Sequence, residues 1–386
     1  MRKLKVMTVF GTRPEAIKMA PLVLELKKHK DVEAIVTVTG QHREMLDQVL
    51  EVFGVTPDFD LNIMKDKQTL TDITSSALAG LDEIIKKERP DLVLVHGDTT
   101  TSFAASLAAL YNQVQIGHVE AGLRTWKKNS PFPEEMNRQL TGVMADLHFS
   151  PTKKSADNLI AENKNKDNIF ITGNTAIDAL QTTVTKDYQH SLLTELNGNK
   201  IILLTAHRRE NLGEPMRNMF KAIKRIVEEH DDVQVVYPVH LNPLVREAAS
   251  DILGDYSRVH LIEPLGVKDF HNFMDRAYFI LTDSGGVQEE APSLGTPVLV
   301  LRDTTERPEG IATGTLKLAG TDQETIYSYM KELLTDQEVY QNMAQASNPY
   351  GDGKASQRIV EAIKYYFHVS DKRPQDIESS EKVYSM

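Results

Sequence analysis

The sequence contains no cysteine among its 386 residues, which excludes disulfide bonds, thiolate metal sites and cysteine nucleophiles. It also lacks a long apolar segment. The longest nearly apolar window, residues 103–111, has about half the length that a membrane-spanning helix needs. Residues 1–10 are basic and then apolar, but the run stops at Gly11 and predicts a first strand rather than a signal peptide. We therefore expect a cytoplasmic protein.

Basic residues are in the minority, with 44 Lys and Arg against 55 Asp and Glu and a formal net charge of −11. A negatively charged surface repels nucleic acid and anionic membrane, so we expect neither as a partner. The composition, 40% hydrophobic and 26% charged, is typical of a folded globular protein. A chain of this length is expected to form two or three domains.

Short β-rich runs alternate with segments of helical period, the pattern of parallel βαβ units. Two such series are separated by a polar stretch, residues 182–200. Strands are expected in the first series at 4–10, 33–39, 92–96, 114–119, 148–150 and 169–172, and in the second at 201–205, 233–239, 258–262, 278–282 and 297–301.

The fold class that this pattern predicts is α/β, with two doubly wound Rossmann-like domains that face each other across a cleft. We expect an N-terminal domain over residues 1–172, a C-terminal domain over residues 173–365, and a tail over residues 366–386 that packs back on the N-terminal domain. Open parallel sheets bind ligands at the carboxyl ends of their strands. Candidate functional residues are therefore sought in the loops that follow the strands.

The first predicted strand leads into residues 11–18, Gly-Thr-Arg-Pro-Glu-Ala-Ile-Lys. Glycine permits a tight turn and proline suits the first position of a helix. Arg13 and Lys18 beside this helix start favour a phosphate site. A plain strand-to-helix cap with solvated basic residues explains the same pattern equally well. The segment is neither a dinucleotide-binding glycine motif nor a Walker loop.

Acidic residues follow the next strands of the first series. Asp98 comes after the strand 92–96 and, taken alone, is best explained as a helix N-cap. Glu120 emerges at the same sheet edge, and two acids at neighbouring strand ends are hard to explain by capping. Glu134 and Arg138 lie at i, i+4 spacing on a predicted helix, where a surface ion pair is the alternative. Together these residues could move protons at carbon and hold a charged substrate.

In the second series His207 follows a strand and precedes two arginines. Arginines bind phosphate oxygens and histidine can donate a proton, although a structural histidine is the alternative. Ser284, Gly285 and Gly286 open another helix and can offer backbone N–H groups to a pyrophosphate, while Glu290 can accept ribose hydroxyls. A plain glycine-rich turn is the alternative. The charged stretch 302–310 is either a solvated loop or part of the anion site.

Metal motifs are poorly represented. Residues 58–60, Asp-Phe-Asp, mimic a metal motif of sugar transferases but precede no convincing strand-end site, so we reject them. Zinc-hydrolase, serine-esterase and calcium-loop motifs are lacking. The residues alone indicate nucleotide-linked anion chemistry, and they leave the substrate open.

Six motifs occur in order, each at a predicted strand end or helix start: residues 11–15, 96–100, 119–125, 133–135, 205–211 and 283–286. With these motifs the chain closely resembles bacterial non-hydrolysing UDP-N-acetylglucosamine 2-epimerases from residue 1 to about residue 365. The resemblance implies a two-domain GT-B-like fold and a homodimer. It implies the reversible conversion of UDP-GlcNAc to UDP-ManNAc without metal or other cofactor, in the supply of cell wall polysaccharides.

The resemblance also implies roles for individual residues. Asp98, Glu120, Glu134 and His207 correspond to catalytic positions, with Arg138 beside them. Nucleotide-binding positions correspond to Arg13, Lys18, Ser284, Gly285, Gly286, Glu290 and Arg307, and Phe270 corresponds to the residue that packs against uracil. A second UDP-GlcNAc, bound as an activator, is implied beside Gln41, Lys67, Arg208 and His240. Glu44 and Lys67 stand where glutamine and arginine are expected in that activator site.

The reaction that the resemblance implies begins with departure of UDP from C1, which acidifies the C2 hydrogen. A carboxylate then removes the C2 proton and leaves a 2-acetamidoglucal, to which UDP returns as a proton arrives on the other face. Asp98, Glu120 and Glu134 are the candidates, and which of them takes the proton stays open. The alternatives are a GT-B-type glycosyltransferase, a hydrolysing epimerase and a non-catalytic UDP-sugar sensor.

Overall fold

The structure, a computed structural model, describes residues 2–41 and 43–377, apart from the side chain of Glu44. Within this range the chain forms two compact units. Unit 1 comprises residues 2–182 and 350–377, and unit 2 comprises residues 183–349.

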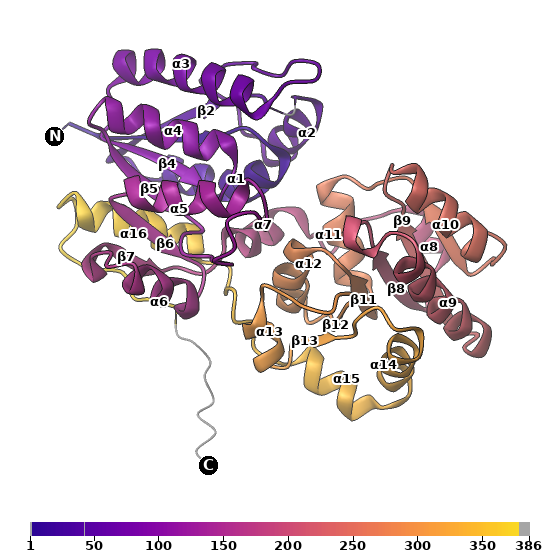
Figure 1. The fold of residues 1–386 in the computed structure, drawn as a ribbon. Helices are drawn as coiled ribbons and strands as arrows, with labels where there is room; N and C mark the ends of the chain where they lie inside the picture. The colour runs from indigo at the N-terminus through magenta and orange to yellow at the C-terminus, as the bar shows by residue number, and fades with distance from the viewer. Residues whose placement is uncertain (1, 42, 378–386) are drawn as a thin grey trace. The chain divides into compact units, whose positions relative to one another are not determined.

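Unit 1 is built on a seven-stranded parallel sheet of strand order β3-β2-β1-β4-β5-β6-β7 (Figure 1). Its strands are β1 (Leu4–Phe10), β2 (Val32–Val38), β3 (Phe59–Asp60), β4 (Leu92–His96), β5 (Gln115–Val119), β6 (Leu147–Ser150) and β7 (Ile169–Ile171). The order reverses between β1 and β4, and ligands of doubly wound sheets bind at such a switch point.

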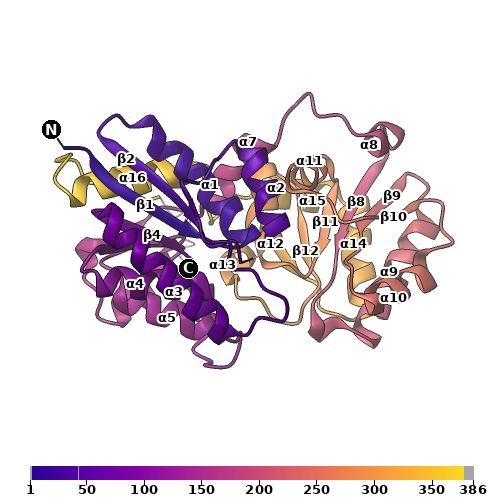
Figure 2. The same cartoon turned by 90° about the horizontal axis from the view of Figure 1, so that it is seen from above.

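Helices cover both faces of this sheet. They are α1 (Arg13–Lys28), α2 (Arg43–Phe53), α3 (Leu70–Glu88), α4 (Thr100–Tyr111), α5 (Glu134–Met144), α6 (Lys153–Ala161), the 3-10 turn η1 (Lys166–Asn168), α7 (Thr175–Thr183) and α16 (Ala355–Tyr366). Figure 2 shows α1 and α16 on one side of β1, β2 and β4, and α3 and α4 on the other. Strand β4 is buried along its whole length, which explains its continuous apolar sequence.

Unit 2 contains a six-stranded parallel sheet of order β10-β9-β8-β11-β12-β13. Its strands are β8 (Lys200–Thr205), β9 (Val233–Pro238), β10 (Val259–Ile262), β11 (Phe279–Thr282), β12 (Val298–Val300) and β13 (Leu316–Leu318). Its helices and 3-10 turns are α8 (Ser191–Glu195), η2 (Arg209–Asn211), α9 (Glu214–Glu229), α10 (Pro243–Leu253), α11 (Val267–Arg276), α12 (Gly285–Glu290), η3 (Ala291–Leu294), α13 (Pro308–Ala312), α14 (Gln323–Thr335) and α15 (Gln337–Ala344).

Helices α9, α10 and α14 share one hydrophobic core with the unit 2 sheet. Phe220 and Ile223 of α9, with Met330 of α14, are fully buried against strand residues such as Leu204 and Val235. The strand order reverses between β8 and β11, so the loops after these two strands lie at the switch point of unit 2.

The predicted fold class, α/β with two doubly wound parallel sheets, is confirmed. Each predicted strand is present, with ends shifted by one residue at most. Two strands were missed, β3 and β13, which have two and three residues and lie at sheet edges. Their sequences, Phe-Asp and Leu-Lys-Leu, are interrupted by a charged residue, whereas the predicted three-residue strands β7 and β12 are apolar throughout.

The division into units differs from the expected boundary at residue 172 and the expected continuous second domain over 173–365. Helix α7 extends unit 1, and residues 350–365 belong to unit 1 as well. The carboxylate of Asp178 in α7 accepts hydrogen bonds from the backbone nitrogens of Ala355 and Ser356 at 3.2 and 2.7 Å. Local periodicity does not encode such a long-range return of the chain.

The described part of the expected tail, residues 366–377, lies on unit 1. The backbone nitrogen of Ile377 donates to the carbonyl oxygen of Ile171 at 2.8 Å, and Arg373 donates to the carbonyl oxygen of Ile169 at 2.8 Å. The rest of that tail, residues 378–386, lies outside the described residues. Across the described chain no helix is both long enough and apolar enough to cross a membrane.

Candidate active site

The loop between β1 and α1 depends on Gly11 and Glu15. A Cβ on Gly11 would lie 2.0 Å from Oγ1 of Thr39, so only glycine fits this turn. The buried carboxylate of Glu15 accepts hydrogen bonds from the backbone nitrogens of Gly11 and Thr12 at 2.9 and 2.8 Å. It also accepts one from Oγ1 of Thr99 at 2.6 Å. Glu15 thus ties the loop that carries Arg13 to the loop after β4.

Sequence reasoning missed the role of Glu15, although Thr12 and Glu15 form a capping box, a pattern visible in the sequence. Burial raises the pKa of the Glu15 carboxyl, against the opposing effect of its hydrogen bonds with Thr99, Gly11 and Thr12. Arg13 is the first residue of α1, and burial lowers the pKa of its guanidinium.

Asp98 is not the cap of α4. The N-cap is Thr99, whose side chain accepts a hydrogen bond from the backbone nitrogen of Ser102 at 3.0 Å. The Asp98 carboxylate instead accepts a hydrogen bond from Arg138 at 2.6 Å. Its backbone carbonyl accepts one from the side-chain amide of Asn137 at 3.0 Å. The cap interpretation was therefore wrong, because the next residue along the chain performs that role.

The charged neighbours of Asp98 are Arg138, Glu120, Glu134 and Lys18. Burial raises the pKa of Asp98 to about 6, Arg138 opposes this rise, and Glu120 and Glu134 add to it. A carboxyl group with this pKa exists in both protonation states near neutral pH, which suits it to exchange a proton with a substrate.

Glu120 follows β5 with φ of 62°, a left-handed conformation that is strained for a residue other than glycine. Its Oε2 contacts the ammonium group of Lys18 and accepts a hydrogen bond from the amide nitrogen of Asn174 at 2.8 Å. Nε2 of the buried His96 lies 3.7 Å from the same oxygen. Burial lowers the pKa of His96 to about 4, so its ring is neutral near pH 7. Lys18, which was predicted to bind nucleotide, thus forms an ion pair with Glu120, which was predicted to be catalytic.

Glu134 and Arg138 both belong to α5, but Arg138 is not part of a simple surface ion pair. Its guanidinium is largely buried and contacts Asp98, with Oε2 of Glu135 3.6 Å from NH1. Oε2 of Glu134 is buried and has no hydrogen-bond partner within the described part of the chain. A buried carboxylate oxygen without a partner carries a large desolvation cost, which is typical of functional sites.

Glu135 is fully buried and holds the loop after β5. Its carboxylate accepts hydrogen bonds from the backbone nitrogens of Thr125 and Trp126, both at 3.0 Å. Burial works to raise the pKa of Glu135, but the hydrogen bonds from Thr125, Gln139 and Trp126 and the charge of Arg138 outweigh it and lower the pKa. Unit 1 thus brings Lys18, Asp98, Glu120, Glu134 and Arg138 together at the carboxyl edge of its sheet.

In unit 2 the fully buried Asp283 organises the loop that carries His207. One oxygen, Oδ2, accepts hydrogen bonds from the backbone nitrogens of His207 and Arg208 at 2.9 and 2.8 Å. It also accepts one from the side chain of Asn211 at 3.0 Å. Asp283 begins the sequence motif 283–286, but the local sequence does not indicate that its carboxylate binds the loop after β8. Its position directly after β11 was the available signal.

The ring of His207 stacks on that of His240, with centroids 5.2 Å apart and an interplanar angle of 11°. Burial lowers the pKa of His207, while the charge of Asp283 opposes that change and His240 and Arg208 add to it. His207 is therefore expected to be neutral near pH 7.

Three of the predicted nucleotide-binding residues, Ser284, Gly285 and Arg307, lie close together at the start of α12. Ser284 is its N-cap residue and Gly285 its first residue. A Cβ on Gly285 would lie 2.6 Å from NH1 of Arg307, so the glycine permits the guanidinium to approach the backbone. Nε of Arg307 donates to the carboxylate of Glu289 at 2.6 Å.

Gly286 and Glu290 follow within the same helix, and a Cβ on Gly286 would lie 3.5 Å from Oε1 of Glu290. Nε2 of the buried His271 is 3.6 Å from Oε2 of Glu290. Phe270 precedes His271 on α11 and is half-buried. The residues predicted to contact the nucleotide in unit 2 are thus carried by α11, α12 and the loop after β12.

The predicted activator residues are divided between the units. In unit 1, Oε1 of Gln41 accepts a hydrogen bond from Oγ1 of Thr101 at 3.2 Å, and its carbonyl oxygen accepts one from Gln68, the neighbour of the exposed Lys67, at 3.5 Å. In unit 2, Nε of Arg208 donates to the carbonyl oxygen of Asp283 at 3.3 Å. The side chain of Glu44 lies outside the described residues.

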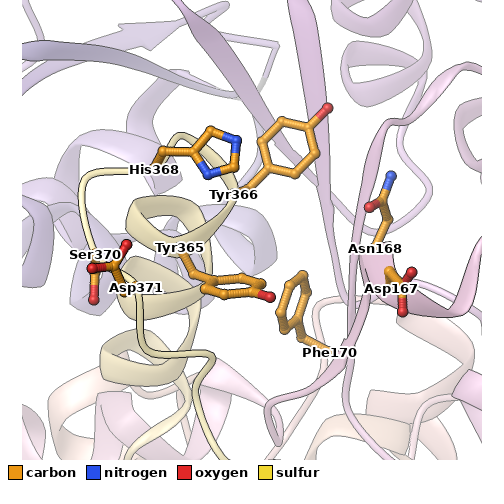
Figure 3. A pocket seen from close by; sticks show the side chains of 8 residues that line it. All are labelled: Asp167, Asn168, Phe170, Tyr365, Tyr366, His368, Ser370 and Asp371. Carbon is orange, nitrogen blue, oxygen red and sulfur yellow. The ribbon is translucent and has the colours of Figure 1, made fainter.

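An open hollow of about 310 Å³ lies between β7 and the end of α16. It is lined by Asp167, Asn168, Phe170, Tyr365, Tyr366, His368, Ser370 and Asp371 (Figure 3), and no predicted site residue is among them. Apart from Glu44, whose side chain is not described, residues 2–41 and 43–377 contain no group of three histidine or acidic side chains placed to hold a metal ion.

Comparisons with known proteins show the family of the chain. The family model described as UDP-N-acetylglucosamine 2-epimerase matches residues 24–364. A Bacillus subtilis (strain 168) protein named UDP-N-acetylglucosamine 2-epimerase is 69% identical over 374 residues, which are 97% of this chain and 98% of that protein.

Solved structures agree in fold. A structure from Listeria monocytogenes is 62% identical, covers 97% of this chain and 100% of its own, and has a TM-score of 0.93. The UDP-GlcNAc 2-epimerase of Neisseria meningitidis, solved with bound UDP-GlcNAc, is 50% identical, covers 93% of this chain and 99% of its own, and has a TM-score of 0.85. The GT-B-like fold class is thereby confirmed, and the chain belongs to the UDP-N-acetylglucosamine 2-epimerase family.

Proposed function

We propose that the protein catalyses the reversible epimerisation of UDP-GlcNAc to UDP-ManNAc at C2 of the sugar. The observation that carries the proposal is the cluster in unit 1, where Asp98, Glu120 and Glu134 lie near Arg138 and Lys18. Moving a hydrogen from one face of a carbon to the other requires groups that can remove and return a proton. The family supplies the substrate, because the relative from Neisseria meningitidis binds UDP-GlcNAc.

The proposed reaction starts with cleavage of the C1–O bond, and UDP leaves with the bonding electron pair. The C2 proton passes to a carboxylate of the cluster, and the C1–C2 double bond of a 2-acetamidoglucal forms. UDP then adds back to C1 while C2 receives a proton on the opposite face. Asp98 suits this exchange because its pKa of about 6 lets it both hold and release a proton near pH 7.

The departing diphosphate gains negative charge, which the protein must stabilise more strongly than it stabilises the intact substrate. We assign this role to Arg13, His207 and Arg307, with the backbone amides of residues 284–286. Glu290 is proposed to accept the ribose hydroxyls, and Phe270 to pack against uracil.

Proton chemistry at C2 gives the decisive test. The protein is incubated with UDP-GlcNAc in deuterated water, without metal or acceptor, and C2 is followed by NMR. We expect deuterium at C2 and accumulation of UDP-ManNAc. Unchanged UDP-GlcNAc would contradict the proposal, free ManNAc would indicate a hydrolysing enzyme, and turnover only with an added acceptor would indicate a glycosyltransferase.

Two variants sharpen this experiment. Glu120→Gln is expected to bind UDP within about twofold of the wild type and to exchange C2 hydrogen at least about 100-fold more slowly, since general base catalysis contributes roughly 10²–10⁴-fold. Glu83→Gln, an exposed change on α3, serves as the matched control. An equal loss of binding and turnover in Glu120→Gln would make Glu120 a substrate anchor.

We further propose that the enzyme works as a homodimer in the cytoplasm and feeds polysaccharide synthesis. Leu140 and Val143 lie on one side of α5 and are 41% and 68% exposed, and Leu110 and Tyr111 at the end of the neighbouring α4 are 47% and 67% exposed. Large apolar side chains exposed together favour a protein interface. A second UDP-GlcNAc is proposed as an activator beside Gln41, Lys67, Arg208 and His240.

A further inference from the structure

Asn174 stands between β7 and α7, and each polar group of its side chain has a defined partner. Oδ1 accepts a hydrogen bond from the backbone nitrogen of Ala176 at 2.9 Å. Nδ2 donates to Oε2 of Glu120 at 2.8 Å. Because Ala176 can only donate at this point, it fixes which end of the amide is oxygen, and the nitrogen must face Glu120.

The backbone of Asn174 is held as firmly as its side chain. Its nitrogen donates to the carbonyl oxygen of Tyr350 at 2.7 Å, and only 3% of the residue is exposed. Tyr350 is the first residue of the segment that returns to unit 1. Asn174 is thus a rigid donor between the end of the sheet and the returning chain.

The conformation of Glu120 depends on contacts with its neighbours. Its backbone has a strained left-handed conformation, which persists only where the surroundings over-determine it. The charged and titratable groups that face its carboxylate include Lys18 from α1, His96 at the end of β4 and Asp98 in the following loop. Asn174, at the start of α7, is a donor at this carboxylate that carries no charge and cannot lose its proton.

We propose that Asn174 is a positioning residue for the epimerisation: its amide nitrogen holds the Glu120 carboxylate ionised and in a single orientation. A hydrogen bond to the charged form of an acid favours that form. The proposal rests on the proposed function, in which Glu120 belongs to the groups that exchange the C2 proton.

The variant Asn174→Asp separates this role from a structural one. Aspartate keeps an oxygen for the backbone nitrogen of Ala176 and is as good as asparagine at a helix start. It replaces the N–H donor by an oxygen that repels Glu120. Asn174→Ala loses both interactions. Asp178→Ala is the matched control, because it removes the hydrogen bonds from α7 to Ala355 and Ser356 without touching Glu120.

We expect Asn174→Asp to bind UDP within about twofold and to melt near the wild type at pH 5, where the two carboxylates share a proton. It should melt at a lower temperature at pH 8, where its buried charge has no partner. Its kcat should fall at least about tenfold at pH 8, where both carboxylates are charged and repel each other. The ratio of its kcat to that of the wild type should recover as pH falls, because a proton shared by the two carboxylates restores a hydrogen bond to Glu120 in place of the lost amide donor. Asp178→Ala should lose stability and keep the kcat of the wild type.

The proposal is overturned if kcat of Asn174→Asp stays within twofold of the wild type at every pH, or if the loss follows melting temperature across the three variants. Failure of the proposed function is distinguishable, because the wild type itself would then form no UDP-ManNAc. In that case the positioning role is still tested by following the NMR shift of the Glu120 carboxyl carbon as a function of pH. Its titration must move to higher pH in Asn174→Ala, and an unchanged titration would overturn the proposal.

Discussion

The carboxyl group of Asp98 lies between opposing influences, because burial favours its neutral form while Arg138 favours its charged form. Burial is the stronger of the two, and the pKa rises from 3.8 to about 6. The folded protein therefore binds more protons than the unfolded chain between about pH 4 and pH 6. Stability falls as pH rises through this window, and the whole cost is present above it.

Replacing Asp98 by a residue that cannot ionise should stabilise the fold at pH values at which Asp98 is charged. We expect Asp98→Asn to raise the free energy of unfolding by up to about 3 kcal/mol at pH 8, since one pKa unit corresponds to about 1.4 kcal/mol, and to change it little at pH 4. Turnover should fall at least about 100-fold at every pH. Urea unfolding at the two pH values measures the first effect, and a stability gain that is equal at both would contradict the assignment.

Residues such as Asp98, Glu120 and Glu134 were accessible to sequence reasoning because each follows a recognisable strand or opens a recognisable helix. Asn174 was not, since its importance depends on a hydrogen bond to a residue 54 positions away. A side chain whose role is to hold another side chain leaves no local pattern. Such residues become visible only when the fold brings the partners together.

At the scale of elements, the two units use the same device at their switch points. In unit 1 the buried Glu15 binds two successive backbone N–H groups of the loop after β1. In unit 2 the buried Asp283 binds two successive N–H groups of the loop after β8. Each carboxylate fixes a loop that carries a residue proposed to bind phosphate, Arg13 in one unit and His207 in the other.

Because Asp283 binds the backbone of the loop after β8, even a conservative substitution of this residue should reduce stability and UDP binding. Asp283→Asn keeps the size of the side chain and one oxygen for the three N–H donors, but it replaces the carboxylate by a neutral amide, which accepts hydrogen bonds more weakly. We expect unfolding to become easier by about 2 kcal/mol, because hydrogen bonds to buried charged groups contribute roughly 1.5–3 kcal/mol each. UDP affinity, measured by calorimetry, should fall as well. The exposed change Asp255→Asn is the control, and equal behaviour of the two variants would contradict the role of Asp283.

Element prediction succeeded where the strand sequence is a continuous apolar run, the edge strand β7 included, and it failed for the edge strands β3 and β13, whose sequences are not. Strand β4 is buried throughout, and its sequence marked it clearly. Strand β3 lies within the segment 58–60, which was considered only as a metal motif and rejected. There the carboxylate of Asp58 accepts a hydrogen bond from the backbone nitrogen of Val36 at 2.8 Å, and that of Asp60 contacts Arg43. Both acids have structural partners that the sequence alone does not reveal.

For the whole molecule, the exposed apolar side chains of α4 and α5 make the proposed dimer testable. Val143→Asp places a charge among the exposed apolar side chains of the proposed interface, where burying it without a partner costs several kcal/mol. We expect the wild type to have the mass of a dimer in light scattering and the variant to have the mass of a monomer. Val369→Asp, at another exposed apolar position, should remain dimeric. A dimeric Val143→Asp would place the interface elsewhere.

The chain passes from unit 1 to unit 2 near residue 182 and comes back at residue 350. This path of the chain sets the order in which the two units can be completed on the ribosome. Unit 2 is one uninterrupted stretch, so its nascent chain is complete once residue 349 has emerged. Unit 1 must wait for α16, whose side chains Ile359, Val360 and Ile363 are fully buried and which packs on α1. Unit 1, which begins to emerge first, is therefore completed last, and until then α1 lacks one of its packing partners.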